Sequence, residues 1–180
     1  MKYNLLNFVC TASLLVSVFF SSCREKGAYK IGEMYDSQLY EDENLAIRIM
    51  AHYEYSQLLS GGLFIFESQI KNNESWDRVF EIRFDDPVQI PNPKELVKKI
   101  GQGKYYIFLG WLYTVSIDYG QNWHTTNIRG FLSQEENIGY GLIGSVDISN
   151  EGKGNMYLRP NRTGKNELIT DDYGVSWRIP

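Results

Sequence analysis

The chain has 180 residues, in which 18 lysine and arginine residues stand against 22 aspartate and glutamate residues, giving a formal net charge of −4. A mildly acidic chain without a basic cluster argues against nucleic acid and other phosphate-rich partners. The only cysteines are Cys10 and Cys23, both near the amino terminus, so a disulfide framework in the rest of the chain is excluded.

The first segment has the pattern of an export signal. Lys2 supplies a positive charge, and residues 5–20 form an apolar stretch that is too short to span a membrane. The stretch ends in Phe20-Ser21-Ser22-Cys23, which resembles a bacterial lipobox, although Phe20 stands where leucine is usual. The resemblance implies that Cys23 is lipidated and anchors the protein in the bacterial cell envelope, at the periplasmic face or the cell surface. The alternative is an ordinary secretory signal whose cleavage site lies beside a cysteine.

The chain divides into three parts on this basis: a lipoprotein signal peptide over residues 1–22, a lipid-anchored tether over 23–44, and a single β-domain over 45–180. The tether is polar and ends in the acidic run Glu41-Asp42-Glu43. Such a run is usually a solvated loop, and the alternative is a contact for a basic partner.

Strand patterns begin at Leu45. Apolar residues recur at every second position from Leu45 to Tyr55, which predicts a half-buried strand. The apolar run at 63–66 predicts a central strand, and a turn at 71–74 leads to a returning strand at 80–84. Asn92 as a cap and Pro93 at the first helical position predict one short helix that ends at Gly101.

The carboxyl-terminal half continues with strands and loops. Residues 105–109 and 111–117 predict two strands, and a polar strand at 124–128 pairs back onto them. The remaining predicted segments are a long loop at 129–141, a hairpin formed by 142–148 and 156–158, a loop at 160–165, and a short strand around Leu168.

Two octets in this half share one pattern, Ser/Thr-x-Asp-Tyr-Gly-x-x-Trp, at residues 116–123 and 170–177. They resemble the Asp box, or BNR repeat, found on β-hairpins of sialidases, other glycosidases and many non-enzymatic β-proteins. The resemblance implies structural roles for Ser116, Asp118, Gly120, Trp123, Thr170, Asp172, Gly174 and Trp177. We expect each aspartate to accept hydrogen bonds from turn N–H groups, and each glycine to take a positive φ that the tyrosine before it could not. The second octet lies close to the last residue, so we expect it to fray.

Trp76 precedes Trp123 by roughly the spacing of a propeller blade. Of the residues before Trp76, only Asn73 keeps the turn chemistry, because asparagine tolerates a positive φ. The segment is therefore either a decayed octet or a coincidence. Three units cannot close a propeller, which needs at least four blades. We predict an all-β fold, either a small antiparallel β-sandwich or a partial propeller-like β-structure.

The sequence does not indicate catalysis. The resemblance to sialidases would require a six-bladed propeller, three arginines and a paired tyrosine and glutamate, and this chain has about half that length. His52 and His124 are the only histidines and lie in unrelated patterns, so we interpret them as solvent-facing strand residues. No glycine-rich loop leads into a lysine and a helix as a phosphate site requires. We predict a non-enzymatic protein without a metal or cofactor.

A binding role is the remaining class. Thirteen tyrosines and four tryptophans are favoured at interfaces, although aromatic residues also fill β-sandwich cores. The run Tyr140-Gly141-Leu142-Ile143, then Val146-Asp147-Ile148, Gly152, Gly154 and the terminal Asp-Tyr-Gly-x-x-Trp, is similar to lipoprotein immunity proteins of type VI secretion toxins. This resemblance implies a secreted toxin as the partner. The alternative is a surface lipoprotein that binds glycans through exposed tryptophan and tyrosine.

Overall fold

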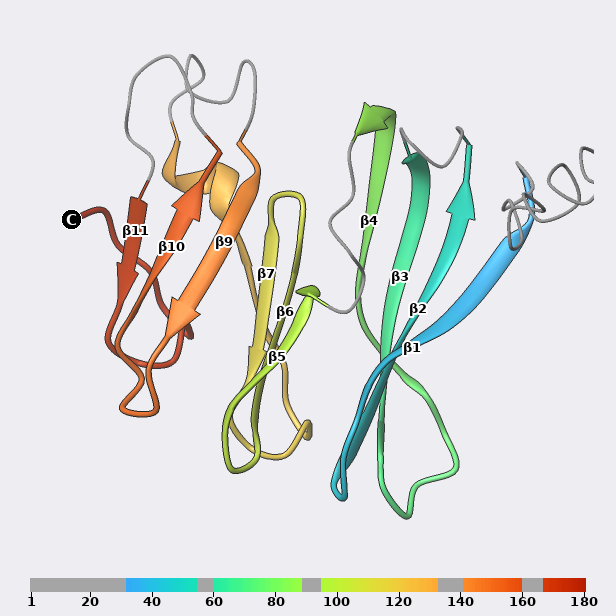
Figure 1. Ribbon diagram of the computed structural model, residues 1–180, viewed down its shortest axis with the longest axis horizontal. Coiled ribbons are helices and arrows are strands. Elements are labelled where there is room, and N and C mark those ends of the chain that lie inside the picture. Colours follow the sequence, from blue (N-terminus) through green and yellow to red (C-terminus); the bar gives the residue numbers. More distant parts are fainter. Residues whose placement is uncertain (1–31, 55–59, 89–94, 133–140, 160–166) are drawn as a thin grey trace, which may run out of the picture.

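The computed structural model describes residues 32–54, 60–88, 95–132, 141–159 and 167–180. Strands make up almost all of the regular structure in these ranges, which confirms the all-β class. The strands form three antiparallel sheets that follow one another along the chain, named here sheets A, B and C (Figure 1). The predicted signal peptide and Cys23 lie outside the described residues.

Sheet A has the strand order β1-β2-β3-β4. Its strands are β1 (Met34–Glu41), β2 (Leu45–Tyr53), β3 (Ser60–Ile70) and β4 (Asp77–Val88). The strand predicted from Leu45 and the hairpin predicted after it are confirmed as β2 and as the β3–β4 pair. β1 lies within the range assigned to the tether, so residues 34–41 belong to the folded domain instead. Its mostly exposed, polar residues suit an edge strand, which has a partner on one side alone.

Sheet B has the order β5-β6-β7-β8. Its strands are β5 (Val97–Gly101), β6 (Lys104–Leu109), β7 (Leu112–Ser116) and β8 (His124–Asn127). A single 3-10 turn, η2 (Ile128–Phe131), follows β8 and begins the segment predicted as a long loop.

The predicted short helix is wrong within the described residues. Val97–Gly101 forms β5, which pairs antiparallel with β6 so that Val97 lies opposite Ile107. Residues three apart lie on opposite faces of a strand, and Val97 and Ile100 are buried in two different hydrophobic cores. A helix would place both on one side, so tertiary packing outweighs the local helix signals. Asn92 and Pro93 lie outside the described residues.

Sheet C has the order β11-β10-β9. Its strands are β9 (Ile143–Ile148), β10 (Gly154–Leu158) and β11 (Glu167–Thr170), and the β9–β10 pair confirms the predicted hairpin. Beyond the second octet, the backbones of Ile169 and Arg178 exchange two hydrogen bonds of 2.9 and 3.0 Å. These bonds tie the end of the chain to β11, so the expected fraying is not seen.

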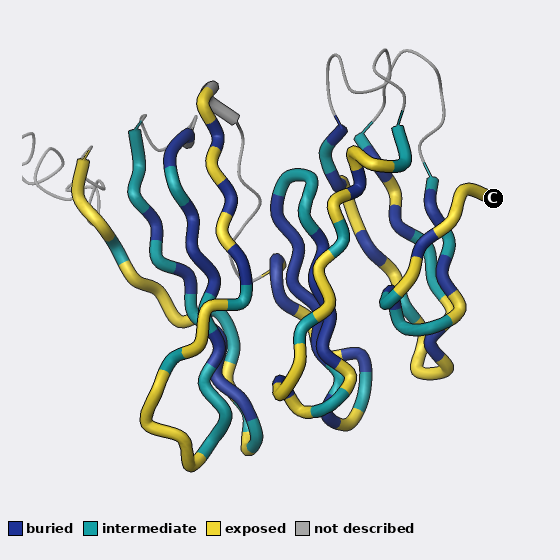
Figure 2. The backbone as a smooth tube through the Cα atoms, turned by 180° about the vertical axis from the view of Figure 1, so that it is seen from behind, coloured by how far each residue is buried: buried dark blue, intermediate teal, exposed yellow. Residues whose placement is uncertain are grey.

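Sheet B lies between the other two sheets (Figure 1), and its inner strands β6 and β7 are buried on both faces. Along β6, Tyr105, Ile107 and Leu109 pack against sheet A, while Tyr106 and Phe108 pack against sheet C. A strand covered on both faces reads as a continuous apolar run, which explains the unbroken sequence of β6. Figure 2 shows buried positions along the strands and exposed positions in the turns at one end of the sheets.

Candidate functional site

The first octet forms a turn stabilised by its own polar side chains. Asp118 Oδ1 accepts hydrogen bonds from the Asn122 backbone N–H at 2.9 Å and from the Ser116 hydroxyl at 2.8 Å. Ser116 Oγ in turn accepts from the Gly120 N–H at 2.9 Å. Partial burial alone would raise the pKa of Asp118, but these bonds outweigh burial and hold the pKa below its ordinary value. The carboxylate is therefore charged at neutral pH and already engaged within the turn.

The second octet repeats this geometry. Asp172 Oδ1 accepts from the Ser176 N–H at 2.9 Å and from the Thr170 hydroxyl at 2.8 Å, and Thr170 Oγ1 accepts from the Gly174 N–H at 3.0 Å. The pKa of Asp172 is lowered in the same way, because hydrogen bonds outweigh the effect of burial.

The backbone conformation of the octet tyrosines differs from the one expected. Tyr119 and Tyr173 have φ values of 62° and 65°, so the prediction that these tyrosines avoid positive φ is wrong. Each backbone N–H donates to the carbonyl of a turn glycine in the preceding hairpin, from Tyr119 to Gly103 and from Tyr173 to Gly152, both at 2.8 Å. Each ring also covers that glycine, since a Cβ on Gly103 would lie 2.7 Å from the Tyr119 ring. These contacts offset the strain of a left-handed tyrosine.

The first octet also joins sheet B to sheet A. The Trp123 indole N–H donates to Ser68 Oγ in β3 at 3.2 Å, and the Trp123 ring packs against the core between the two sheets. Gly120 lies so close to Leu45 of β2 that a Cβ would meet that side chain at 2.6 Å.

The second octet joins sheet C to sheet B in the corresponding way. Trp177 packs edge-on against Tyr113 of β7, with ring centroids 5.2 Å apart. The Tyr113 hydroxyl donates to the Tyr173 carbonyl at 3.0 Å, and a Cβ on Gly174 would meet that hydroxyl at 2.4 Å. Each octet therefore packs its own sheet onto the sheet that precedes it in the chain.

The turn before Trp76 differs from both octets. Its positive φ of 74° belongs to Asn72, not to Asn73, whose side chain instead accepts from the backbone and hydroxyl of Ser75. Trp76 is covered by the Arg48 guanidinium at 4.3 Å from the ring centroid. Among the described residues, sheet A is the first of the three sheets along the chain.

Asp42, in the acidic run, holds sheets A and B together at the β1–β2 turn. Its carboxylate accepts from Lys99 Nζ at 2.7 Å and from the Tyr105 hydroxyl at 2.8 Å, and from the backbone N–H groups of Asn44 and Leu45. Burial opposes the charged form, yet these bonds outweigh it and lower the pKa of Asp42, while burial and then Asp42 raise the pKa of Tyr105. The basic contact of this carboxylate is thus Lys99 of the same chain.

The histidines are not brought together. His52 is half-buried in β2 of sheet A, and His124 is exposed in β8 of sheet B. In the described part of the chain, no group of three or more histidine, cysteine, aspartate or glutamate residues could hold a metal ion. Nor does any described helix have the length and apolar character needed to cross a membrane.

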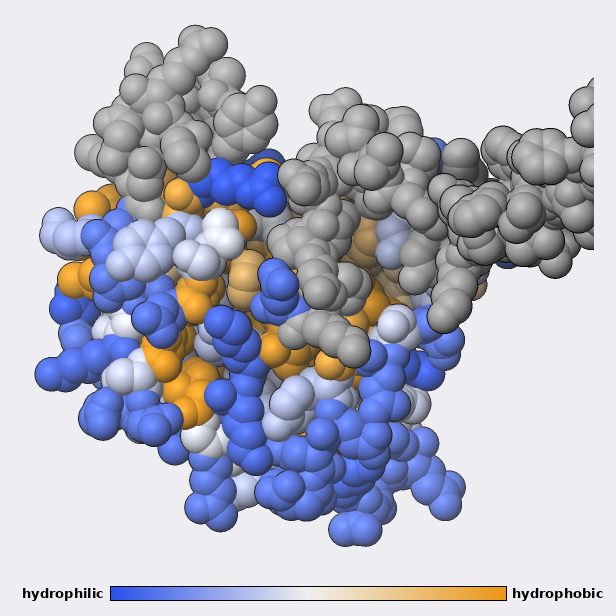
Figure 3. All heavy atoms as spheres, viewed as in Figure 1, coloured by the Kyte–Doolittle hydropathy of each residue, from blue (hydrophilic) through white to orange (hydrophobic). Residues whose placement is uncertain are grey.

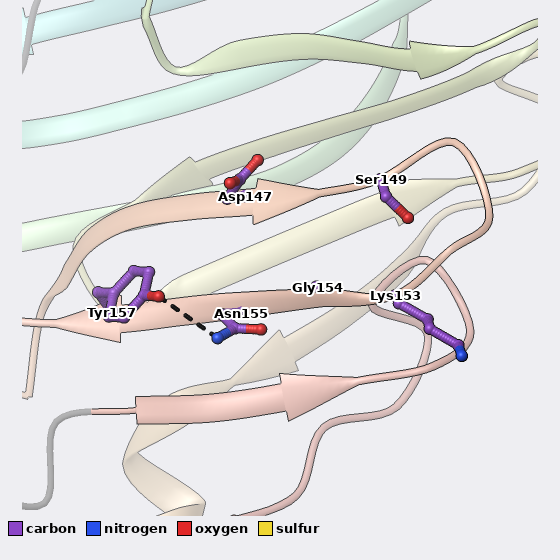
Figure 4. A pocket seen from close by; sticks show the side chains of 6 residues that line it. All are labelled: Asp147, Ser149, Lys153, Gly154, Asn155 and Tyr157. Atoms are coloured by element: carbon purple, nitrogen blue, oxygen red, sulfur yellow. Dashed lines mark hydrogen bonds between the residues drawn. The ribbon is translucent and has the colours of Figure 1, made fainter.

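The outer face of sheet C carries a shallow hollow of about 310 Å³ that opens to solvent. Its lining comes from β9, β10 and the turn between them: Asp147, Ser149, Lys153, Gly154, Asn155 and Tyr157 (Figure 4). Alternation along the strands directs these side chains away from sheet B. Tyr157 is 46% exposed, whereas the other tyrosine and phenylalanine side chains described in the strands are buried or half-buried.

Tyr157 and Asn155 are the central residues of this face. Tyr157 lies opposite Ser145 of β9 and Glu167 of β11, and Asn155 lies opposite Asp147 and Ile169. The Asn155 side-chain amide donates to the Tyr157 hydroxyl at 3.3 Å and to the Glu167 carboxylate. Within the described residues, Asp147 makes no ion pair and no side-chain hydrogen bond. The hollow thus combines an exposed ring with a carboxylate that no described neighbour neutralises.

The outer face of sheet A has a different character. Its charged side chains neutralise one another, as in the ion pairs of Arg48 with Glu67 at 2.7 Å and of Arg83 with Glu54 at 2.6 Å. Figure 3 shows hydrophilic side chains covering the lower part of this sheet. This face is typical of a solvated surface.

The fold and its faces define an all-β protein made of three stacked antiparallel meanders, with a polar hollow on one terminal sheet. No protein-family model, curated protein or solved structure matches the chain.

Proposed function

We propose that this chain is a non-enzymatic, exported lipoprotein domain that binds a type VI secretion toxin and neutralises it as an immunity protein. Cys23 would hold the domain at the membrane by its lipid, so that the toxin meets it in the cell envelope. Tyrosine and tryptophan side chains would supply much of the contact with the toxin, as they do at many protein interfaces.

The observation that supports this proposal is the exposure of Asp147 beside Tyr157. In the run that is similar to immunity proteins, the other described residues have structural tasks. Ile143 and Val146 are buried in the core between sheets B and C, and Gly152 and Gly154 allow close backbone and ring contacts. Asp147 is exposed and charged, whereas the aspartates of the second octet are engaged, Asp171 with Arg178 and Asp172 within its turn. An exposed, charged side chain that makes no described hydrogen bond or ion pair within the fold is a candidate for contact with a partner.

The hydrogen bonds around Asp42 indicate that this carboxylate has a structural role. Asp42 is held charged by five hydrogen-bond donors, and Tyr105 is held neutral, so neither is prepared to act as a base or nucleophile at neutral pH. This arrangement supports a binding role over a catalytic one.

A contact-killing assay tests the proposal. A strain that lacks this gene should be killed by its parent on contact, and should survive beside a parent whose type VI secretion is inactive. Restoring the full-length gene should restore survival. Equal survival of the deletion strain beside both parents would reject the immunity function.

Glycan binding is a second candidate, favoured by the exposed Tyr157 ring in a hollow large enough for a sugar unit. Aromatic rings that border polar side chains can stack on sugar rings. A glycan array probed with the mature chain tests it, and retention on defined oligosaccharides that Tyr157→Ala abolishes would favour this function over the first.

A further inference from the structure

We propose that the hollow on sheet C receives a guanidinium side chain of the partner protein, an arginine that lies against the Tyr157 ring and pairs with the carboxylate of Asp147, with Glu167 opposite Tyr157 on β11. The inference rests on the proposed function, because it assumes that the partner is a protein. It names the residue type that the partner presents and the three residues that receive it.

The polar groups around Tyr157 are mostly acceptors. Asn155 donates both of its observed side-chain bonds within the face, to Tyr157 and Glu167, which leaves its side-chain oxygen as an acceptor. The two oxygens of Asp147 accept from no described side chain. A ligand that fits this set must be rich in donors, and a guanidinium offers five N–H donors and no acceptor.

The aromatic ring adds a second, independent requirement. Among the described residues, cations cover four other rings: Arg48 lies over Trp76 at 4.3 Å, Arg129 over Trp111 at 3.6 Å, Lys104 over Tyr173 at 4.8 Å, and Lys99 over Tyr105 at 5.7 Å. Among the described residues no cation covers Tyr157. An exposed ring flanked by carboxylates attracts a cation through both groups at once.

The outer face of sheet A contains the completed form of this arrangement. There the Arg48 guanidinium lies over the Trp76 ring and pairs with Glu67 at 2.7 Å. Sheet C presents an aromatic ring and carboxylates as sheet A does, but no described cation lies over the ring. Lys153 does not complete the arrangement, because it lies at the far end of the hollow from Tyr157 with its side chain directed away (Figure 4).

The size of the hollow fits a single anchoring side chain. A volume of about 310 Å³ accommodates one arginine side chain. The face of three short strands is smaller than the roughly 800 Å² that each partner of a standard interface buries. The arginine would therefore be the central contact of a wider interface, as arginines often are.

Titration with a small probe tests the site without the toxin. The mature chain carrying Cys23→Ser, labelled with ¹⁵N, is titrated with N-acetyl-arginine amide while amide chemical shifts are recorded. We expect shifts at Asp147, Asn155, Tyr157 and Glu167. N-acetyl-citrulline amide has nearly the same shape without the charge, and should give at least fivefold weaker binding.

Variants separate the site from general effects of charge. Asp147→Asn and Tyr157→Ala should each weaken the arginine probe at least threefold, while the melting temperature stays unchanged because both side chains are exposed. Asp77→Asn removes an exposed carboxylate from sheet A and should leave the affinity as it is.

Several results would overturn the inference. Equal binding of the arginine and citrulline probes would remove the charge requirement, and the absence of shifts on β9 and β10 would remove the site. Shifts with a neutral chitotriose but not with arginine would assign the hollow to a glycan. If contact killing shows immunity while the arginine probe fails, the function stands and this site is wrong. If the probe binds while the deletion strain survives, the site stands and the function is wrong.

Discussion

Single carboxylates in this chain act as acceptors that hold turns in place. Asp118 and Asp172 each accept a backbone N–H within their own octet, and Asp42 accepts two in the β1–β2 turn. A carboxylate with several short donors is stabilised in its charged form. The same bonds that fix the turn therefore keep these groups from acting as bases.

Replacing Asp118 or Asp172 by alanine should lower the free energy of unfolding by about 0.5–1.5 kcal/mol, because each change removes the acceptor of an exposed turn N–H. The bonds of the two carboxylates match, so the two losses should be similar. Urea denaturation of both variants measures them, with Asp77→Asn as the control. An unchanged midpoint for Asp118→Ala, combined with loss of partner binding, would assign that aspartate to a ligand instead.

Asp42→Asn should destabilise the protein in a pH-dependent manner. The pKa of Asp42 is lower in the folded chain than in the unfolded chain, so its contribution is present above the unfolded value of about 3.9 and is lost as pH falls toward the folded value. The variant should be less stable than the parent by about 1–3 kcal/mol at pH 7. The gap should narrow at pH 3, as measured by urea midpoints. A gap that is constant over this range would show that the charge of Asp42 does not stabilise the fold.

The octet sequence alone is enough to predict that Asp118 accepts a turn N–H, since donor and acceptor lie within one octet. The positive φ of Tyr119 depends on Gly103, which belongs to another hairpin, so the octet does not reveal it. Tyr157 escapes prediction because Met156-Tyr157-Leu158 reads as an apolar run. Alternation along β10 from Lys153 is the available signal, since it places Lys153, Asn155 and Tyr157 on one face.

At the level of elements, the recurring unit is a hairpin turn glycine covered by an octet tyrosine. Gly103 precedes β6 and is covered by Tyr119, and Gly152 precedes β10 and is covered by Tyr173. The pairing holds the octet turn against the hairpin of its own sheet. The Lys104 ammonium over the Tyr173 ring adds a contact between sheets B and C.

Gly103→Ala should destabilise the chain by more than about 1 kcal/mol, because a Cβ would strike the Tyr119 ring and the φ of 66° is unfavourable for alanine. Gly152→Ala should behave alike, as its φ is 87°. Gly130→Ala is the matched control, since a Cβ at Gly130 would have no atom within 4 Å. Thermal melts of the three variants compare them. Adding Tyr119→Ala to Gly103→Ala should restore part of the loss, and no restoration would show that the ring contact is unimportant.

Two elements show where sequence patterns fail. Asn92, Pro93 and Gly101 resemble helix boundaries and so predict a helix where β5 forms, whereas pairing with β6 decides its conformation. β1 reads as part of a tether because an edge strand with mostly exposed residues lacks the alternation of a buried strand. Both errors concern edge strands, whose structure depends on a neighbouring strand.

In the whole molecule, the three sheets are stacked in chain order. Each octet packs against the sheet that precedes its own sheet in the chain. Trp123 contacts sheet A and Trp177 contacts sheet B. The outer faces of sheets A and C carry charged and polar side chains such as Arg48 and Glu67 on sheet A and Asp147 on sheet C, as expected at the ends of a stack. Strand patterns in the sequence are enough to predict an all-β fold. They do not predict that each octet packs on the preceding sheet, because that packing depends on contacts between sheets.

Trp177→Ala should lower the free energy of unfolding by about 3–5 kcal/mol, because the ring is 7% exposed and fills the core between sheets B and C. Trp123 is half-buried, so Trp123→Ala should cost less than Trp177→Ala, yet more than Asp118→Ala. Chemical denaturation gives the order. A larger loss for Trp123→Ala than for Trp177→Ala would contradict it.

Cys23→Ser should move the protein from the membrane fraction to the soluble fraction, since the proposed lipid is its anchor. Immunoblots of fractions washed with salt and carbonate measure this. A variant that stays in the membrane pellet would rule out the lipid as the sole anchor.

The most direct test of the whole account is survival in contact killing of the deletion strain that carries Asp147→Asn together with Tyr157→Ala. The octets and cores are untouched by these exposed changes, so the variant should keep the parent's melting temperature and envelope level. We predict that it fails to protect the cell, whereas Asp77→Asn protects as the parent gene does. Full protection by the double variant at parental levels would contradict the claim that the outer face of sheet C binds the toxin.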